Sequence, residues 1–555
     1  MRAPRPRVAV ALVLVASLLL RLALALVLFP GQGLSSDLGL FQSWAETLAR
    51  VGPGSFYASS ASANYPPGYM YVLWLVGVLG GTVGNALGVS SAQGTLLLLK
   101  LPAIAADLAI AWLLYRAATR WFGGWAGVVA AALYLFVPVT WYDSALWGQV
   151  DAVGTLLMLA AVLLLIDGWS EPAAAVAALS LLVKPQDGVV LVVLIPILVR
   201  RHLLRAGSGP VPRPGAILSR LDRRIGSRMT TFLADQGSAR LGTSAIAFAI
   251  ALLLPVLPFD VDAFAPAALA GVPVIGQAAG LIGLYVSAGG QFSVLTANAY
   301  NLWALVGPHP LASAIGSATG SWTPDSLAVL AGLPAVLVGA GALALVGLLV
   351  AGGLLLRDDR LAIVLGFALA AFAFYALPTR VHERYLFAFF APAALLASGI
   401  AAPALGYLAV GVANAVNIHA VLAAPLSIGR GFGIARGGGF DGSGAGAGPG
   451  AFGGFGGAGG VPGPGFAGAG GVPGGGAFGG GGSPVDASSI HLPLAQLARS
   501  EPVVIAVALA QEAAFAVLLA AWLAVAFVPV VRPRLAAWRA TAIRDAAASG
   551  GLPRS

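Results

Sequence analysis

The sequence predicts an all-α polytopic membrane protein with about 12 transmembrane helices and additional helices in its extracytoplasmic loops. Hydrophobic residues make up 59% of the 555 residues and charged residues only 9%, and the mean hydropathy is +0.90. Runs of about 20 apolar residues, each long enough to cross a hydrocarbon core of roughly 30 Å as a helix, recur from end to end. Backbone groups in lipid must be paired within their own segment, so these runs are expected to be helices.

Arginine-rich segments between the apolar runs set the expected topology. They lie at 2–7, 116–120, 200–240, 357–360 and 532–544, and the positive-inside bias places all of them in the cytoplasm. The first apolar run is interpreted as an uncleaved helix, because it is too long for a signal peptide and lacks a cleavage site. The predicted spans are 9–29, 98–116, 124–140, 152–167, 172–183, 187–199, 241–257, 326–350, 361–377, 386–402, 404–424 and 502–528.

Two further apolar stretches, 70–89 and 272–287, are interpreted as segments that lie within or dip into the outer leaflet. Counting the first as a span would put Arg116 and Arg120 outside. Three regions follow from this reading. Residues 1–428 form the transmembrane core, residues 429–485 form a Gly/Ala/Pro/Phe-rich disordered extracytoplasmic loop, and residues 486–555 hold the last transmembrane helix and a basic cytoplasmic tail.

The charge and cysteine content exclude some classes of function. The formal net charge is +9, but the basic residues lie in short stretches between apolar runs, as topology signals do, so no nucleic-acid partner is expected. The chain has no cysteine, which excludes disulfides and thiolate metal sites.

A few cations lie on the predicted outer side, against the topological bias. The chain has only two lysines, Lys100 and Lys184, and both fall at predicted outer helix ends, where Arg380 and Arg384 join them. Cations in this position indicate attraction to an anionic group outside the membrane. The alternative is that they extend to lipid headgroups along their aliphatic stems.

Acidic, amide and aromatic residues share that face. A carboxylate that takes a proton from an acceptor, with cations that stabilise a departing phosphate, suits the transfer of a sugar from a phosphate-linked lipid. Aromatic rings can stack on sugars. The residues of this mixture are Asp37, Asp143, Asp151, Glu383, Gln149, Gln186, His382 and the segment YPPGY from Tyr65 to Tyr69.

Over roughly residues 10–425 the sequence resembles the GT-C superfamily of polyprenyl-phosphate-sugar-dependent glycosyltransferases. The resemblance is to the dolichyl-phosphate-glucose glucosyltransferases of the N-glycan pathway and to the GPI mannosyltransferases. The motifs that carry it are SSDLGLFQSWAETL around Asp37, YPPGY, KLPAIAADL from Lys100, ALWGQVDA from Ala145, KPQ from Lys184, NAYNLW from Asn298 and VHERY from Val381.

The resemblance implies a GT-C-like fold and an inverting transferase that needs neither metal nor cofactor. Its donor would be a polyprenyl monophosphate carrying a hexose, with mannose as the expected sugar, and its acceptor a glycan, glycolipid or protein outside a prokaryotic inner membrane. Asp37 would be the catalytic base. The donor phosphate would be bound by Lys184, His382 and Arg384, and the sugar or acceptor by Asp151, Gln149, Gln186, Tyr65 and Glu383.

Each residue also has a simpler interpretation. Asp37 and Asp151 could be helix caps, and His382 could be an ordinary core histidine. Asp107 lies too deep in its predicted helix for outer-face chemistry, so a buried structural partner is expected for it. Asn298, Asn301 and Trp303 could shape the lipid-entry side or simply form a turn at the interface.

For the whole chain, a rival function is a secondary transporter or lipid-linked-sugar flippase, which would also carry charges among its spans. Transporters usually place such groups near the midplane in repeated halves, whereas here they gather at one face. A third possibility is an inactive scaffold whose Gly-rich loop recruits partners.

Overall fold

Helices dominate the part of the chain that the computed structural model describes, which is residues 5–206, 209–212, 219, 222–224, 227–306, 323–399, 401–423, 488–490 and 492–528. Within these ranges, six helices are long and apolar enough to cross a membrane, or seven if a bent pair counts as one span. The structure therefore supports a polytopic, mostly helical membrane protein. The tract at 429–483 and the basic segment at 532–544 lie outside the described residues.

The helices of the N-terminal half include the bent pair. In order they are α1 (Pro6–Leu22), α2 (Ser35–Val51), α3 (Phe56–Ser59), α4 (Pro67–Leu87), α5 (Ser91–Leu98), α6 (Leu101–Phe122), α7 (Gly124–Phe136), α8 (Pro138–Trp141), α9 (Asp151–Ile166), α10 (Ser170–Leu181) and α11 (Leu191–Leu198).

The second half adds further helices, and the described part of the chain also has three pairs of very short strands. The helices are α13 (Arg228–Ala234), α14 (Ser238–Leu253), α15 (Ile275–Gly290), α17 (Ala335–Leu356), α18 (Arg360–Ala376), α19 (Phe390–Gly399), α20 (Ala401–Leu422), α21 (Ala495–Ala498) and α22 (Glu501–Ala526). The strand pairs are β1 (Gln32–Gly33) with β6 (Ser488–Ser489), β2 (Thr296–Ala297) with β5 (Val381–His382), and β3 (Ala328–Leu330) with β4 (Leu333–Pro334).

One predicted span has the wrong boundary. The span expected at 326–350 begins as helix only at Ala335, because residues 328–334 form the β3–β4 hairpin. Gly332, at its turn, has a φ of +79°, which glycine adopts at low cost.

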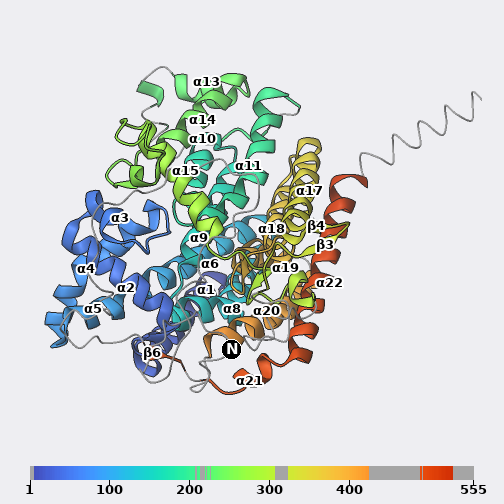
Figure 1. Ribbon diagram of the computed structural model, residues 1–555. Coiled ribbons are helices and arrows are strands. Elements are labelled where there is room, and N and C mark those ends of the chain that lie inside the picture. Colours follow the sequence, from blue (N-terminus) through green and yellow to red (C-terminus); the bar gives the residue numbers. More distant parts are fainter. Residues whose placement is uncertain are drawn as a thin grey trace, which may run out of the picture.

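Helices α2, α4 and α5 form a separate layer at one edge of the molecule, opposite α22 (Figure 1). Glycines on α4 allow its neighbours to approach closely: a Cβ at Gly77 would collide with the carbonyl of Ala45, and one at Gly80 with the hydroxyl of Thr95. A capping box between Ser90 and Gln93 starts α5, as such boxes do in many helices. Helix α4 is one of the six long apolar helices, so length alone does not exclude it as a span.

The bent pair turns the chain toward the polar residues at one end of the bundle. Helix α7 and the helical segment Pro138–Trp147 meet at an angle of 53°, and Pro138 starts the second segment because proline cannot continue the first. Gly148 then ends it with a φ of +85°. The Lys100 ammonium binds the backbone at this end of the segment. It donates to the carbonyls of Ala145 and Leu146 at 2.9 and 3.0 Å.

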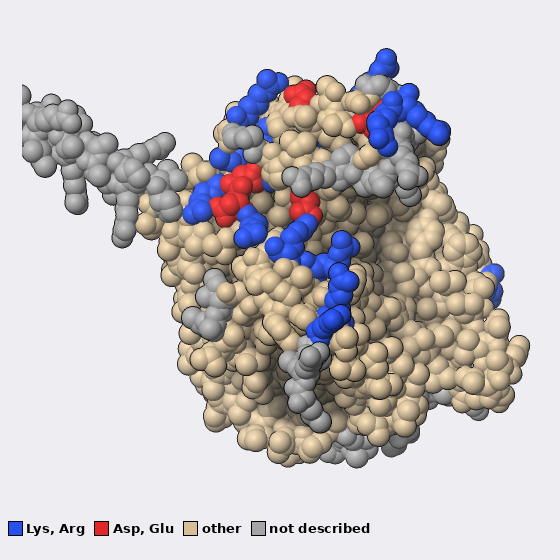
Figure 2. Space-filling view, turned by 180° about the vertical axis from the view of Figure 1, so that it is seen from behind, with Lys and Arg blue, Asp and Glu red and all other residues tan. Residues whose placement is uncertain are grey.

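The bundle has two ends with different polar contacts. At one end, ion pairs join Arg120 to Asp167 at 2.9 Å and Arg201 to Asp358 at 2.6 Å. The opposite end holds β1 and β6, the paired β2 and β5, and the segment after α10. Charged side chains are also unevenly spread over the surface. On the face that Figure 2 shows, basic and acidic residues gather in one part, and the rest is largely uncharged.

A fully buried ion pair ties α1 to α6 inside the bundle. The Arg21 Nε lies 3.0 Å from Asp107 Oδ2, and neither side chain is exposed. Tyr134 and Ser144 also donate to the Asp107 carboxylate, at 2.8 and 2.6 Å. The partner expected for Asp107 is therefore Arg21, and the surrounding hydroxyls satisfy the carboxylate's remaining lone pairs.

Removing one member of this pair should destabilise the protein strongly. We expect Arg21→Met to lower the free energy of unfolding by about 3–5 kcal/mol, because it leaves the Asp107 carboxylate buried without its cation. The double variant Arg21→Met/Asp107→Leu should recover part of the loss. Denaturant unfolding in detergent measures both.

Arg120→Gln is the matched control, since the Arg120–Asp167 pair is 52% and 39% exposed and such pairs contribute roughly 0–1 kcal/mol. A loss with Arg21→Met no larger than with Arg120→Gln would contradict a structural role for the buried pair.

Candidate functional site

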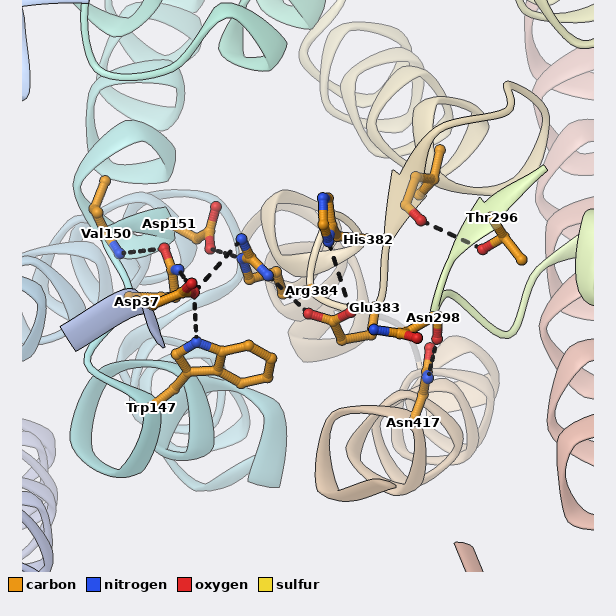
Figure 3. Close-up of polar contacts among 12 residues, drawn as sticks. Asp37, Trp147, Val150, Asp151, Thr296, Asn298, His382, Glu383, Arg384 and Asn417 are labelled. Atoms are coloured by element: carbon orange, nitrogen blue, oxygen red, sulfur yellow. Dashed lines mark hydrogen bonds and ion pairs between the residues drawn. The ribbon is translucent and has the colours of Figure 1, made fainter. Parts of the chain in front are cut away.

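Four segments that are far apart in sequence bring polar side chains together at one end of the bundle. Figure 3 shows the side chains of Asp37, Asp151, His382, Glu383 and Arg384 among them. Asp37 lies in the first turn of α2, Gln149 and Asp151 follow the bent pair, and Lys184 follows α10. The fourth segment carries His382 on β5, with Glu383 and Arg384 after it. Parallel pairing of Thr296 with Val381 anchors β5 to the chain before α17.

The Asp37 carboxylate is held through one of its two oxygens. The indole N–H of Trp147 donates to Oδ2 at 2.9 Å, the Gln149 side-chain amide donates to the same atom, and Arg384 Nη2 lies 3.8 Å from it. Within the described residues no hydrogen bond to Oδ1 is formed. The Asp37 side chain is 23% exposed, so its second oxygen remains available as a proton acceptor.

A buried ion pair lies beside Asp37. Lys184 Nζ is 2.7 Å from Asp151 Oδ1 and 3.3 Å from the side-chain oxygen of Gln149, and Gln186 reaches the same Asp151 oxygen at 3.5 Å. Burial lowers the pKa of Lys184, but the Asp151 carboxylate outweighs burial and the net pKa is raised. Lys184 is therefore a permanent cation, which lies over the Tyr65 ring at 5.4 Å from its centroid.

Arg384 links its own segment to the starts of α2 and α9, through contacts with Asp37 and Asp151. Figure 3 shows its guanidinium between Asp37 and Asp151 on one side and Glu383 on the other. The distances are 3.7 Å from Nε to Asp151 Oδ2 and 2.8 Å from Nη1 to Glu383 Oε1. Burial raises the pKa of Glu383, although Arg384 opposes the shift.

His382 completes the group. Its Nδ1 lies 3.9 Å from Glu383 Oε2, and its ring meets Phe292 edge-on at a centroid distance of 4.8 Å. Burial, with the nearby charges of Arg384 and Lys184, lowers the pKa of His382 well below its usual value. The imidazole is therefore neutral near pH 7 and has one N–H to donate.

These side chains open onto a cavity of about 610 Å³. Asp37, Lys184, His382 and Arg384 all line it, as do the predicted binding residues Tyr65, Gln149, Gln186 and Glu383. Asp151 lies beneath this lining and faces a small adjoining cavity of about 20 Å³, which Gln186 and Arg384 also line. A cavity of this size with carboxylates, cations and aromatic rings can hold a sugar and its phosphate.

Some of the polar residues singled out in the sequence line this cavity, and others have their contacts elsewhere. Asp37 and Asp151 are not side-chain caps, since neither is the residue that caps its helix. Lys100 faces neither an anion nor the lipid, because it is 2% exposed and bonded to carbonyls. Asn298 lines the cavity, whereas Asn301 and Trp303 donate to carbonyls at the end of α18, those of Tyr375 and Leu377.

Trp147 and Asp325, which hold charged groups of the site in place, were not singled out as site residues from the sequence. Trp147 stands in the ALWGQVDA motif, so its position beside Gln149 was a usable signal. Asp325 had no such signal: it binds Arg380 Nε at 2.6 Å, and Arg380 lines the cavity. Within the described ranges no three His, Asp or Glu side chains are grouped as ligands for a metal ion.

Comparison with known protein families identifies a related segment. Residues 65–209 match the model of the dolichyl-phosphate-mannose-protein mannosyltransferase family. No curated protein matches the chain. The matched segment contains Tyr65, Gln149, Asp151, Lys184 and Gln186, and it supports the recognition of the chain as a relative of the GT-C polyprenyl-phosphate-sugar glycosyltransferases.

The neutral state of His382 predicts an acid sensitivity of the fold. In the unfolded chain a histidine takes up a proton as the pH falls through about 6.5, whereas folded His382 does so only at lower pH. The unfolded state then binds more protons, so stability falls below pH 6.5 by up to about 1.4 kcal/mol per pH unit. His382→Gln should reduce this loss, measured as the midpoint of thermal unfolding between pH 7 and pH 5.

His419→Gln is the control for losing an imidazole, because His419 is held by Tyr142 and the Pro493 carbonyl and does not belong to the lining of the cavity. Equal acid sensitivity in the wild type and His382→Gln would show that His382 is already charged in the folded protein.

Proposed function

We propose that this chain, which is related to the GT-C membrane glycosyltransferases through residues 65–209, transfers a hexose from a polyprenyl monophosphate to an extracytoplasmic acceptor. Mannose is the proposed sugar, because the matching family is that of the dolichyl-phosphate-mannose-protein mannosyltransferases. The observation that carries the proposal is the convergence of Asp37, Lys184, His382 and Arg384 on one cavity. The acceptor is a glycan, a glycolipid or a protein.

In the proposed reaction Asp37 is the general base. Its Oδ1 accepts the proton of the acceptor hydroxyl while Trp147 and Gln149 hold Oδ2 in place. The acceptor oxygen attacks the anomeric carbon, the bond from that carbon to the phosphate oxygen breaks with inversion, and the phosphate leaves with the electron pair. A positioned general base of this kind contributes about 10²–10⁴-fold.

Lys184, Arg384 and His382 are proposed to bind the donor phosphate. The first two provide fixed positive charge, and the neutral imidazole provides an N–H donor. Their carboxylate partners already surround the cations, so part of the negative charge must be neutralised when a phosphate enters. Glu383 can do this by taking up a proton, since burial raises its pKa. Gln149, Gln186, Asp151, Glu383 and Tyr65 are proposed to contact the sugar or the acceptor.

We propose twelve membrane crossings, with the cavity on the outside of a prokaryotic inner membrane and residues 1–428 as the catalytic core. Support comes from length and composition: α1, α6, α17, α20 and α22 lie in helices long and apolar enough to cross a membrane, and α9, α14, α18 and α19 are shorter apolar helices. Helices shorter than a full span, such as α9 and α18, would cross with the help of their flanking turns. Helix α4 packs on α2 and α5 and is proposed to stay outside.

Cysteine labelling tests this topology, because the chain has no cysteine of its own. Ser59→Cys and Asn85→Cys, at exposed positions before and within the last turns of α4, should react with a membrane-impermeant thiol reagent added to intact cells. Ala234→Cys, at the end of α13, should react only after the membrane is opened. Protection of Asn85→Cys with labelling of Ser59→Cys would mean that α4 crosses the membrane.

Transfer assays test the proposed roles. With radiolabelled polyprenyl-phosphate mannose and a membrane extract, Asp37→Asn should lower single-turnover transfer by about 100-fold while leaving the binding of a non-transferable donor analogue intact. Arg384→Ala should weaken both, because its contact with phosphate exists before and during bond cleavage.

Asp235→Asn, at an exposed position outside the cavity, is the matched control and should behave as the wild type. Transfer by Asp37→Asn at nearly the wild-type rate would contradict its role as base. Exchange of intact donor across the membrane without transfer would favour a flippase instead.

A further inference from the structure

A second pocket lies at the end of the bundle opposite the candidate site. Its volume is about 330 Å³, and it forms where α6, α9 and the turn after α11 end and where α18 begins. Three guanidinium groups, two carboxylates and an indole line it, those of Arg120, Arg201, Arg360, Asp167, Asp358 and Trp121. None of these residues takes part in the proposed transfer reaction.

One wall of the pocket is fixed by Arg201. This side chain is 2% exposed, and its Nε and Nη2 each bind Asp358 at 2.6 Å while Nη1 binds the Leu165 carbonyl at 2.6 Å. A bidentate contact of this kind between a guanidinium and a carboxylate fixes the geometry of both groups. The facing pair, Arg120 with Asp167, is largely exposed and contributes little to stability, so Arg120 can turn toward an incoming anion.

Arg360 is the cation that these carboxylates do not compensate. Its guanidinium carbon lies 5.4 Å from the centre of the Trp121 ring and 5.9 Å from that of Phe122. In the part of the chain that the structure describes, Arg360 forms no ion pair. A guanidinium stacked on aromatic rings can still use its N–H edge for hydrogen bonds, and Arg360 belongs to the lining of the pocket.

We propose that this pocket binds the phosphate group of an anionic phospholipid. Three arginines against two aspartates leave one positive charge, which matches a phosphate diester. Exposed apolar side chains flank Arg360, with Phe122 at 44%, Leu361 at 38% and Leu356 at 40%. These surfaces suit acyl chains, and the end of an apolar helix bundle is the depth at which headgroups lie. The lipid would belong to the leaflet opposite the cavity that contains Asp37.

Titration calorimetry on the full-length protein in a neutral detergent tests the proposal. Dihexanoylphosphatidylglycerol should bind saturably, and dihexanoylphosphatidylcholine should bind more weakly because its choline neutralises the charge. Arg360→Gln should weaken the phosphatidylglycerol binding by about tenfold or more, since it removes one charge-assisted contact. Arg50→Gln, which removes an exposed charge at the end of α2, should leave it unchanged.

A second variant, Arg120→Gln, should also weaken phosphatidylglycerol binding, which keeps the test valid if Arg360→Gln does not fold. Inorganic phosphate distinguishes the source of the anion. If it binds as tightly as the lipid and with the same dependence on Arg360, the site is one for free phosphate and the lipid assignment is wrong. If neither variant changes the binding of phosphatidylglycerol, the pocket is not its site.

Discussion

The burial of Arg384 among three carboxylates is the constraint on which the rest of the structure depends. Its side chain is 10% exposed and lies within 4 Å of Asp37, Asp151 and Glu383. A guanidinium in such surroundings is tolerated only if opposite charges surround it, and removing one partner leaves an uncompensated charge. The start of α2, the start of α9 and the segment after β5 must therefore meet at one point, and the cavity is the space between them.

The membrane environment explains why part of the site could be predicted from the sequence. Charged side chains are costly inside the hydrocarbon core and must lie at helix ends or in pairs, so Lys184 and Arg384 stood out as cations on a predicted outer face. The carboxylate of Asp37 stood out on the same predicted face, and the GT-C resemblance implied its role as base. The depth of Asp107 along its helix predicted a buried partner, and Arg21 is that partner. For Asp107 the expectation followed from the cost of desolvating a charge, whereas for Lys184 and Arg384 it followed from the positive-inside bias.

What the sequence did not predict depends on contacts between distant segments. The bond from Trp147 to Asp37 exists because the chain bends at Pro138, and the angle of a bend is not encoded in hydropathy. Asp325 pairs with Arg380, 55 positions further along the chain, and no local sequence pattern identifies such a partner. Lys100, like Lys184, was expected at an outer helix end near an anionic group, yet it binds backbone carbonyls at the end of the bent pair. Burial of a cation predicts that it has a partner but does not identify that partner.

The central claim is that the cluster around Arg384 receives the phosphate of a lipid-linked sugar. An experimental structure with a non-hydrolysable polyprenyl-phosphate sugar bound measures this most directly. Our account predicts that the phosphate lies within hydrogen-bond distance of Arg384 and Lys184, with the anomeric carbon on the Asp37 side of it. A phosphate bound elsewhere, with the cavity around Asp37 unchanged, would contradict the account.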